Sequence, residues 1–332
     1  MKKSLQDLWI RGLLLITLSV FFAFSGTSQS LMFGNGPTQI EAGINVGPMF
    51  FLGDLGGHAG KGTPFLKDLN LPLTKVDKGL FVTVYPNSWF GLRFAVDFGK
   101  MDGFDSIINT KGVNELWRKQ RNLDFRTNIS EGYVAAEIYP IMFLNKEFDD
   151  FKPRFRPYGV IGIGLFHFNP QGSLTTNGVT KWYYLKPLHT EGEGFAEYPN
   201  RNNYALTQVN IPMGIGFKYF LSDRVNVGME ILYRKTFTDY IDDVSTTYID
   251  PTLFYKYLSP QNAAIATAIS DKTIGIVTPG VTRYSPGTQR GDPSQKDAYF
   301  SVGLKFAMRL GPIFDNMYDR RVASHMRCPS IY

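Results

Sequence analysis

The sequence has one cysteine and four histidines, and it has no long apolar run beyond its first 30 residues. A single cysteine excludes an internal disulfide, and no histidine or cysteine cluster has the spacing of a zinc site. Without a later run of about 20 apolar residues, a membrane-spanning helix is not expected. No basic run is interleaved with aromatic residues, so the net charge of +6 does not indicate a nucleic-acid partner.

The amino terminus has the pattern of a secretory signal peptide. Lys2 and Lys3 precede an apolar run over residues 13–24, and the small residues 25–28 follow. Because the run is shorter than the roughly 20 residues of a bilayer-spanning helix, removal as a signal peptide is favoured over a membrane anchor. The predicted organisation is a signal peptide over 1–28, a folded unit over 29–310 and a tail over 311–332.

What the chain has instead is a repeated alternation of apolar and polar or small residues. It is clearest over residues 298–310, where Val302, Leu304 and Phe306 share one face while Gly303 and Lys305 share the other. This period of two is typical of a β-strand with one apolar and one polar face. Eight stretches are predicted as strands on this basis: 39–52, 80–85, 89–100, 131–143, 157–168, 206–221, 225–238 and 298–310.

Repeated strands of this kind in an exported chain predict a β-barrel, because a membrane accepts only helices or closed sheets. We therefore expect an all-β fold, an eight-stranded antiparallel transmembrane β-barrel in contact with outer-membrane lipids. The first, third, fifth and seventh connections are the long ones: 53–78, 101–129, 169–205 and 239–296. A chain that enters from the periplasm places these four loops outside the cell and its C-terminal tail in the periplasm. Short helices are expected within 251–270.

The predicted inward faces carry charges of both signs. They are Glu41, Arg93, Asp97, Glu137, Lys218, Glu230, Arg234, Lys305 and Arg309. Side chains nearly fill the lumen of an eight-stranded barrel, so these charges are expected to pair across it as a plug. A passive pore is therefore disfavoured.

The histidines His58, His167, His189 and His325 are scattered, and none lies in a catalytic pattern. His167 stands between two phenylalanines at the expected outer end of a strand, where an interfacial ring needs no catalytic role. We expect no enzymatic activity and no cofactor, and a lipid-modifying barrel enzyme is the least favoured alternative.

An aspartate-rich segment stands in the last long loop. Asp239, Asp242, Asp243 and Asp250 have the oxygen ligands that calcium prefers, but the segment lacks the glycine and terminal glutamate of an EF-hand. The favoured interpretation is that these acids and the nearby Ser245, Thr246 and Thr247 bond to backbone amides in turns or to bases such as Arg290. No bound metal is expected.

Three stretches of the chain resemble a known family. Residues 238–245, the pair Arg290 and Gly291 followed by residues 297–299, and the terminal Cys328 and Pro329 resemble the PorG-like outer-membrane barrels of Bacteroidetes. The resemblance implies a role in the type IX protein secretion and gliding machinery. In that machinery the barrel associates with a periplasmic ring built from a lipoprotein and its partner.

The resemblance implies that Cys328 bonds to the ring lipoprotein, because a tail cysteine in the family is implicated in that bond. It is an unpaired thiol in an exported chain, and Arg320, Arg321 and Arg327 would favour its reactive thiolate form. Together with Pro329 these residues are the predicted partner-binding set. An inert free thiol is the alternative for Cys328, and a surface adhesin that binds through its long loops is the alternative for the protein.

Overall fold

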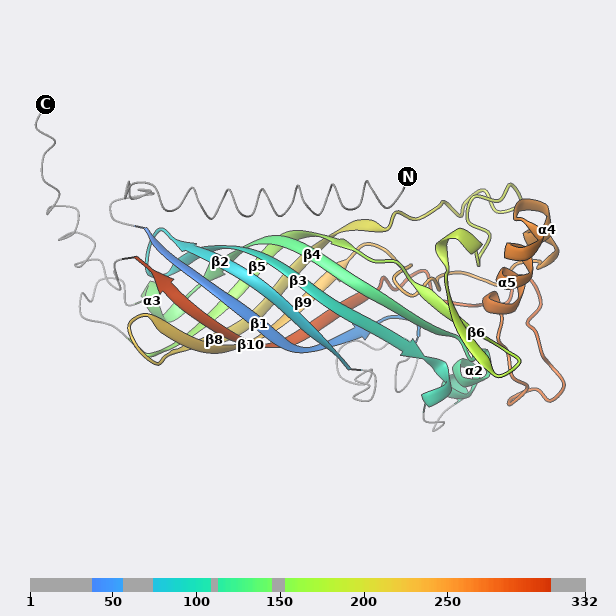
Figure 1. The fold of residues 1–332 in the computed structure, drawn as a ribbon, viewed down its shortest axis with the longest axis horizontal. Helices are drawn as coiled ribbons and strands as arrows, with labels where there is room; N and C mark the ends of the chain where they lie inside the picture. Colours follow the sequence, from blue (N-terminus) through green and yellow to red (C-terminus); the bar gives the residue numbers. More distant parts are fainter. Residues whose placement is uncertain (1–37, 56–73, 109–112, 145–152, 312–332) are drawn as a thin grey trace, which may run out of the picture.

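The computed structural model describes residues 38–55, 74–108, 113–144 and 153–311, and eight long strands among them form an antiparallel barrel (Figure 1). The signal peptide, the tail beyond residue 311 and His58 lie outside the described residues. The barrel strands are β1 Gln39–Leu52, β2 Lys75–Tyr85, β3 Phe90–Phe104, β4 Asp124–Ile138, β5 Phe155–His167, β8 Thr207–Phe220, β9 Val225–Thr236 and β10 Ala298–Leu310.

The barrel is closed, because each of these strands pairs with a neighbour on both sides. The first and last strands meet antiparallel, from Ile40 opposite Leu310 to Leu52 opposite Ala298. Chain neighbours complete the ring, and β5 pairs directly with β8. A closed ring has no unpaired strand edge. An unpaired edge would be costly inside a bilayer, because no water is present there to pair with its backbone groups. The predicted fold class is confirmed.

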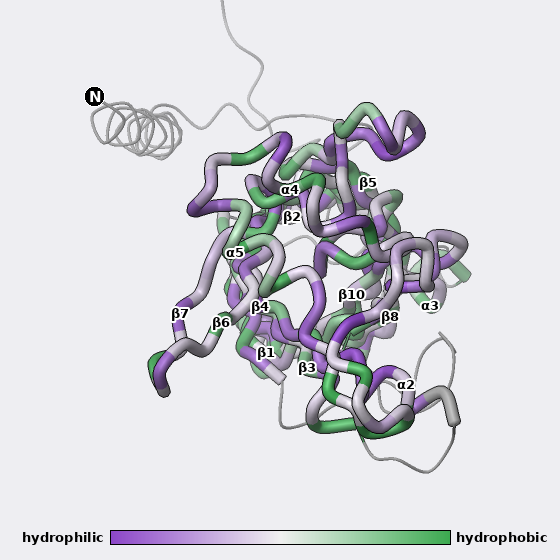
Figure 2. The backbone as a smooth tube through the Cα atoms, turned by 90° about the vertical axis from the view of Figure 1, so that its right-hand side faces the viewer, coloured by the Kyte–Doolittle hydropathy of each residue, from purple (hydrophilic) through white to green (hydrophobic). Residues whose placement is uncertain are grey.

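The two ends of the barrel differ (Figure 1). One end, the short-turn end, has the β2–β3 and β8–β9 turns and the helix α3 Pro140–Leu144. The other, the loop end, has the long connections, and Figure 2 looks onto it. The elements in those connections are η2 Asp105–Ile107, α2 Val113–Arg121, the hairpin β6 Gln171–Thr176 and β7 Val179–Tyr184, η3 Lys186–Leu188, α4 Thr252–Tyr257 and α5 Pro260–Ser270. No helix in the described part of the chain is long and apolar enough to cross a bilayer.

Three strand predictions were wrong by four residues or more in their bounds, and one of them is β3, which ends at Phe104 rather than at residue 100. The fourth strand runs over Asp124–Ile138 rather than 131–143, because Pro140 starts the short helix α3, where its missing N–H costs nothing. At its other end β4 pairs with β3 as far as Phe104 opposite Asp124, so the predicted loop over 101–129 is shorter than expected. β2 begins at Lys75 rather than at residue 80.

The outer surface of the barrel is apolar. Large apolar side chains that point outward are well exposed to the surroundings, with Leu80 58% exposed, Ile163 62% and Ile215 68%. Their alternate neighbours along each strand are buried inside, as in the burial pattern of β4. An apolar outside and a polar inside are the reverse of a water-soluble barrel and match a surface that faces lipid. The molecule has the fold of an outer-membrane barrel.

Candidate functional site

The inward side chains meet in two layers of buried ion pairs. In the layer nearer the short-turn end, Arg93 donates from Nε to Glu137 over 2.6 Å. Its two terminal nitrogens donate to the two oxygens of Glu230 over 2.8 and 2.7 Å. Arg93 is fully buried, so its orientation is fixed by these charge-assisted bonds rather than by solvent.

Two lysines complete this layer, which we call the inner layer. Lys218 Nζ lies 2.5 Å from Glu41 and 3.3 Å from Glu137, and it also donates to the Tyr85 hydroxyl over 2.5 Å. Lys305 Nζ lies 3.3 Å from Glu230. The three cations of the layer therefore share three carboxylates, and each charge is compensated in the place where it is buried.

The second layer, which we call the outer layer, lies toward the loop end and centres on Arg234. This guanidinium lies 2.9 Å from Asp97, 3.1 Å from Glu131 and 3.6 Å from Asp77. Asn210 donates to Glu131 over 2.6 Å, which ties the layer to β8. Five strands thus contribute to one polar cluster across the lumen.

Eight of the nine predicted lumen residues lie in these two layers. Arg309 is opposite Glu41 in the register of β1 and β10, and its guanidinium lies 4.1 Å from the centre of the Phe220 ring at the short-turn end. Asp77 and Glu131 belong to the outer layer but were missed by the sequence analysis. The two-residue alternation could have identified both as inward-facing. Glu131 shares a face with Tyr133 and Glu137, and Asp77 shares a face with Thr83.

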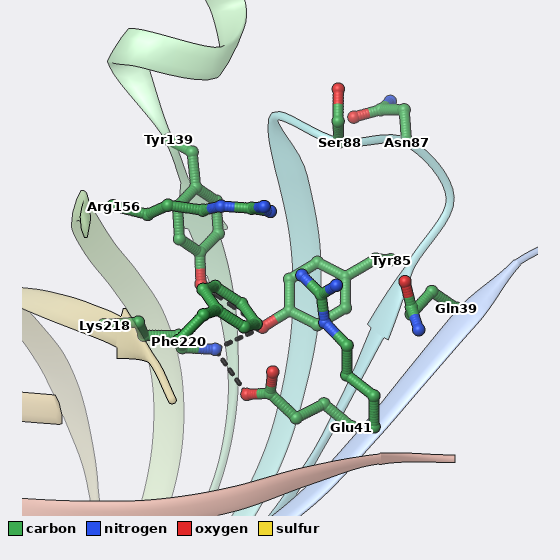
Figure 3. A pocket seen from close by; sticks show the side chains of 10 residues that line it. Gln39, Glu41, Tyr85, Asn87, Ser88, Tyr139, Arg156, Lys218 and Phe220 are labelled. Atoms are coloured by element: carbon green, nitrogen blue, oxygen red, sulfur yellow. Dashed lines mark hydrogen bonds and ion pairs between the residues drawn. The ribbon is translucent and has the colours of Figure 1, made fainter. Parts of the chain in front are cut away.

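A pocket opens at the short-turn end of the lumen (Figure 3). Gln39, Tyr139 and Arg156 are among its walls, and Lys218 and Glu41 line it with their ion pair between them. Arg93 and Glu230 do not line it. A solute that entered this mouth would therefore stop at the inner layer.

At the loop end, the structure separates the four aspartates that the sequence grouped as a loop or metal candidate. Asp250 precedes α4 and accepts from the N–H of Thr252 over 2.9 Å and from its hydroxyl over 2.7 Å, which is a turn role. Asp243 is buried and accepts from the hydroxyls of Tyr204 and Thr190 over 2.6 and 2.5 Å. Asp239 and Asp242 face a different set of residues, beside Asp54 and Asp297.

Asp243 belongs to a second buried network, which contains Arg290 as the sequence predicted and Glu191 and Glu193, which the sequence did not indicate. Arg290 donates to Glu191 over 2.8 Å and to the backbone carbonyl of Asp243 over 2.6 Å, rather than to an aspartate side chain. Burial raises the pKa of Asp243 to about 6 even though Arg290 opposes this. Burial also raises the pKa of Glu193 to about 8, helped by Asp243 and Glu191.

Two of the remaining candidates, His167 and His189, lie among the described residues, and each has a ring nitrogen close to one oxygen atom. His167 lies at the loop end of β5 with Nδ1 3.0 Å from the Thr207 hydroxyl, and His189 Nδ1 lies 2.7 Å from the Glu193 carbonyl. His325 and the predicted partner-binding residues Arg320, Arg321, Arg327, Cys328 and Pro329 lie outside the described residues.

Comparison with known proteins adds little beyond the barrel type. No family model and no curated protein matches the chain. The N-terminal barrel domain of Pseudomonas aeruginosa OprF is 8% identical, with 82% of this chain and 99% of that chain covered and a TM-score of 0.29. The Yersinia pestis attachment invasion locus protein Ail, solved with the heparin analogue sucrose octasulfate, is 7% identical, with 82% and 99% covered and a TM-score of 0.33.

A major outer membrane protein from Thermus thermophilus is 9% identical, with 82% of this chain and 99% of that chain covered and a TM-score of 0.36. These TM-scores are too low for a close superposition. The barrel assignment therefore depends on the strand pairings and on the apolar outer surface described above.

Proposed function

We propose that this protein is an outer-membrane barrel that anchors a periplasmic ring complex of the type IX protein secretion machinery and has no catalytic step of its own. The observation that carries the proposal is the filled lumen. Two layers of ion pairs, centred on Arg93 and Arg234, occupy it. A barrel filled in this way conducts solutes poorly. The parts of it that a partner can use are its rigid lipid-facing wall and the surfaces at its two ends.

Two of the three stretches that carry the family resemblance, residues 238–245 and the segment around Arg290 and Asp297, support the proposal by contacting each other at the loop end. The N–H of Asp297 donates to the Thr238 carbonyl over 3.0 Å, and the N–H of Arg290 donates to the Thr246 carbonyl over 2.8 Å. The N–H of Ile241 donates to the Asp297 carboxylate over 2.8 Å. Segments that are far apart in the sequence thus share a specific set of contacts at the loop end, which a chance likeness of short motifs would not require.

The anchoring contacts are assigned to the opposite, short-turn end and to the tail. In this proposal the tail follows β10 into the periplasm, and Cys328 forms a disulfide with a cysteine of the ring lipoprotein. The two thiols lose two protons and two electrons, and the thiol-oxidising system of the envelope accepts the electrons. Arg320, Arg321, Arg327 and Pro329 would flank this bond.

The test is purification of the ring from cells that carry the full chain, Cys328→Ser, or a deletion of residues 312–332. We expect the ring lipoprotein to run with the barrel on non-reducing gels and to separate on reduction or in Cys328→Ser. The double variant Cys328→Ser with Ser330→Cys is the matched control and should restore part of the adduct. If Cys328→Ser retains the adduct, the latch is wrong; if the ring does not co-purify with the unmodified chain and the tail deletion secretes normally, the anchor itself is wrong.

A surface-recognition role is the second candidate, and one observation favours it. The loop end carries exposed aromatic side chains, with Tyr184 53% exposed and Tyr255 56% exposed. Such side chains are common in binding surfaces. Shortening the β6–β7 hairpin and replacing Tyr255 by Ala should abolish attachment to a surface while secretion continues, if this candidate holds. The lipid-modifying alternative predicts altered lipid A after His167→Ala.

A further inference from the structure

The pocket at the short-turn end gathers positive charge. Among the described residues that line it, Arg156, Arg309 and Lys218 are basic and Glu41 is the acid. Glu41 accepts with one carboxylate oxygen from Lys218 over 2.5 Å and with the other from Asn226 over 2.9 Å. Both oxygens of the lining acid are therefore already engaged by residues of the barrel.

The fold holds the like charges of this pocket close together. Arg156 on β5 lies directly opposite Lys218 on β8. The guanidinium of Arg156 lies 4.4 Å from the centre of the Phe220 ring, and that of Arg309 lies 4.1 Å from the centre of the same ring. Both arginines are only 6% exposed, so water screens their charges little, and like charges opposite each other in a sheet are destabilising. An anion that entered beside them would lower this cost.

Gln39 offers an uncharged donor on another wall of the pocket. It is 3% exposed, and its Nε2 has no hydrogen-bond partner among the described residues. In Figure 3 it lies across the pocket from Phe220. A buried N–H group without a partner is costly, and an acceptor that enters the cavity beside it removes that cost. The pocket thus presents donors to an oxyanion from two sides.

The size of the pocket restricts which anion it admits. Its cavity volume is about 20 Å³, which is enough for one or two groups the size of a water molecule. A carboxylate at the end of a side chain is of this size, whereas a lipid headgroup is larger. The two oxygens of a carboxylate also match the planar fork of a guanidinium.

The rim around the pocket is basic as well. Arg154, before β5, and Arg224, in the β8–β9 turn, are both exposed, with one exposed acid, Asp223, beside them. Backbone hydrogen bonds place these two arginines next to lining residues, because the Arg154 carbonyl accepts from Phe220 over 2.9 Å and the Arg224 carbonyl accepts from Arg309 over 2.8 Å. Exposed cations around a cationic pocket attract an acidic partner.

We propose that this pocket binds the carboxylate of an aspartate or glutamate side chain from a protein partner at the short-turn end. Arg156 and Arg309 hold the carboxylate, and Gln39 donates to it from the other wall. The inference rests on the proposed function, in which this end faces the periplasmic ring. It adds a non-covalent contact to the disulfide assigned to Cys328.

The probe is a short fluorescent peptide of glycine and glutamate, and the control peptide has glutamine in place of glutamate. Binding to the purified full chain in micelles of an uncharged detergent is measured by fluorescence anisotropy at low salt. We expect saturable binding of the glutamate peptide alone, weakened as salt is added. Acetate should compete better than inorganic phosphate at equal ionic strength. No binding, or stronger competition by phosphate, would overturn the proposal.

Variants locate the binding in the pocket. Arg156→Gln and Arg309→Gln should each weaken peptide binding about ten-fold or more, since each removes a charged donor. Arg154→Gln is the matched control, because it removes an exposed arginine of the same end that does not line the pocket, and it should bind nearly as the unmodified chain does. An equal loss in Arg154→Gln would show that the peptide follows net charge alone and would overturn the proposal.

Gln39→Glu tests the pocket without removing an arginine. It places a carboxylate of nearly the same shape inside the pocket, so it should block the peptide and raise the melting temperature. A lowered melting temperature with peptide binding retained would show that the pocket takes no carboxylate. The peptide experiment involves neither the ring nor Cys328, so its failure overturns the pocket alone. Failure of the ring to co-purify with the unmodified chain contradicts the anchor and leaves the peptide result unchanged.

Discussion

Arg93 and Glu230 are joined across the lumen by two parallel hydrogen bonds of 2.8 and 2.7 Å. They belong to β3 and β9, which are not neighbours in the barrel wall. The pair therefore connects opposite sides of the ring through its interior. Because Arg93 also binds Glu137 on β4, one side chain braces three strands. This cross-brace makes the barrel a rigid and filled cylinder.

Replacement of Arg93 by Leu should destabilise the barrel strongly. It leaves the buried carboxylates of Glu137 and Glu230 with lysines as their only ion-pair partners, and loss of one member of a buried ion pair costs about 3–5 kcal/mol. Urea unfolding of the refolded protein in micelles, followed by tryptophan fluorescence, measures this loss in the free energy of unfolding.

Two further variants make that measurement specific. Lys181→Ala removes an exposed charge on β7 and should change the free energy of unfolding little. Combining Arg93→Leu with Glu137→Gln should recover part of the stability, because two lysines and two carboxylates then remain in the layer, Lys218 with Glu41 and Lys305 with Glu230. An Arg93→Leu loss no larger than that of Lys181→Ala would contradict a central bracing role.

Gly79 makes room for the outer ion-pair layer. A Cβ atom at this position would lie 1.8 Å from Asp97 Oδ1 and 2.6 Å from the backbone oxygen of Val96. Gly79→Ala should therefore push Asp97 away from Arg234 and cost about 1–3 kcal/mol, the usual range for overpacking. Gly132→Ala on β4 is the control, since nothing lies within 4 Å of its added Cβ. Equal unfolding curves for the two variants would show that the lumen tolerates the methyl group.

Glu193 makes the stability of the loop end depend on pH. Its pKa rises from 4.5 to about 8 through burial and through Asp243 and Glu191, while Arg290 opposes the shift. Between those two pH values the folded state keeps a proton that the unfolded state has lost, so stability falls as pH rises. The slope is at most about 1.4 kcal/mol per pH unit.

The melting temperature should therefore fall between about pH 5 and pH 8, and Glu193→Gln should flatten that fall. Glu197→Gln is the control. The pKa of Glu197 is lowered by hydrogen bonds from Lys256 and Tyr257, so it titrates below this window. A profile for Glu193→Gln as steep as that of the unmodified chain would assign the pH dependence to other groups.

The sequence was sufficient for the barrel because strands with a two-residue period carry their own signal. The strands over 39–52 and 298–310 have the predicted bounds, and two helices lie within 251–270 as expected. The β6–β7 hairpin was missed although Asn177 and Gly178, with φ of 52° and 75°, form a turn that this dipeptide favours. Its strands are short and polar, so the alternation that identified the barrel strands is absent there.

The candidate sites were less predictable, since they depend on strand register. Periodicity showed that Arg93 and Glu230 point inward, but it cannot show that these two, from non-adjacent strands, meet each other. Likewise, Asp239 and Asp242 were grouped with Asp243 and Asp250 because they are close in sequence. The fold instead places them with Asp54 and Asp297, which are brought near only when β1 and β10 close the barrel.

The central claim is that the barrel spans the outer membrane with its loop end outside the cell and its short-turn end in the periplasm. Single cysteines in the Cys328→Ser chain test this directly: Tyr255→Cys on α4 and Asp223→Cys in the β8–β9 turn, treated with a membrane-impermeant maleimide. We predict that intact cells label only the cysteine at position 255 and that permeabilised cells label both. Labelling of the cysteine at position 223 in intact cells would contradict the account.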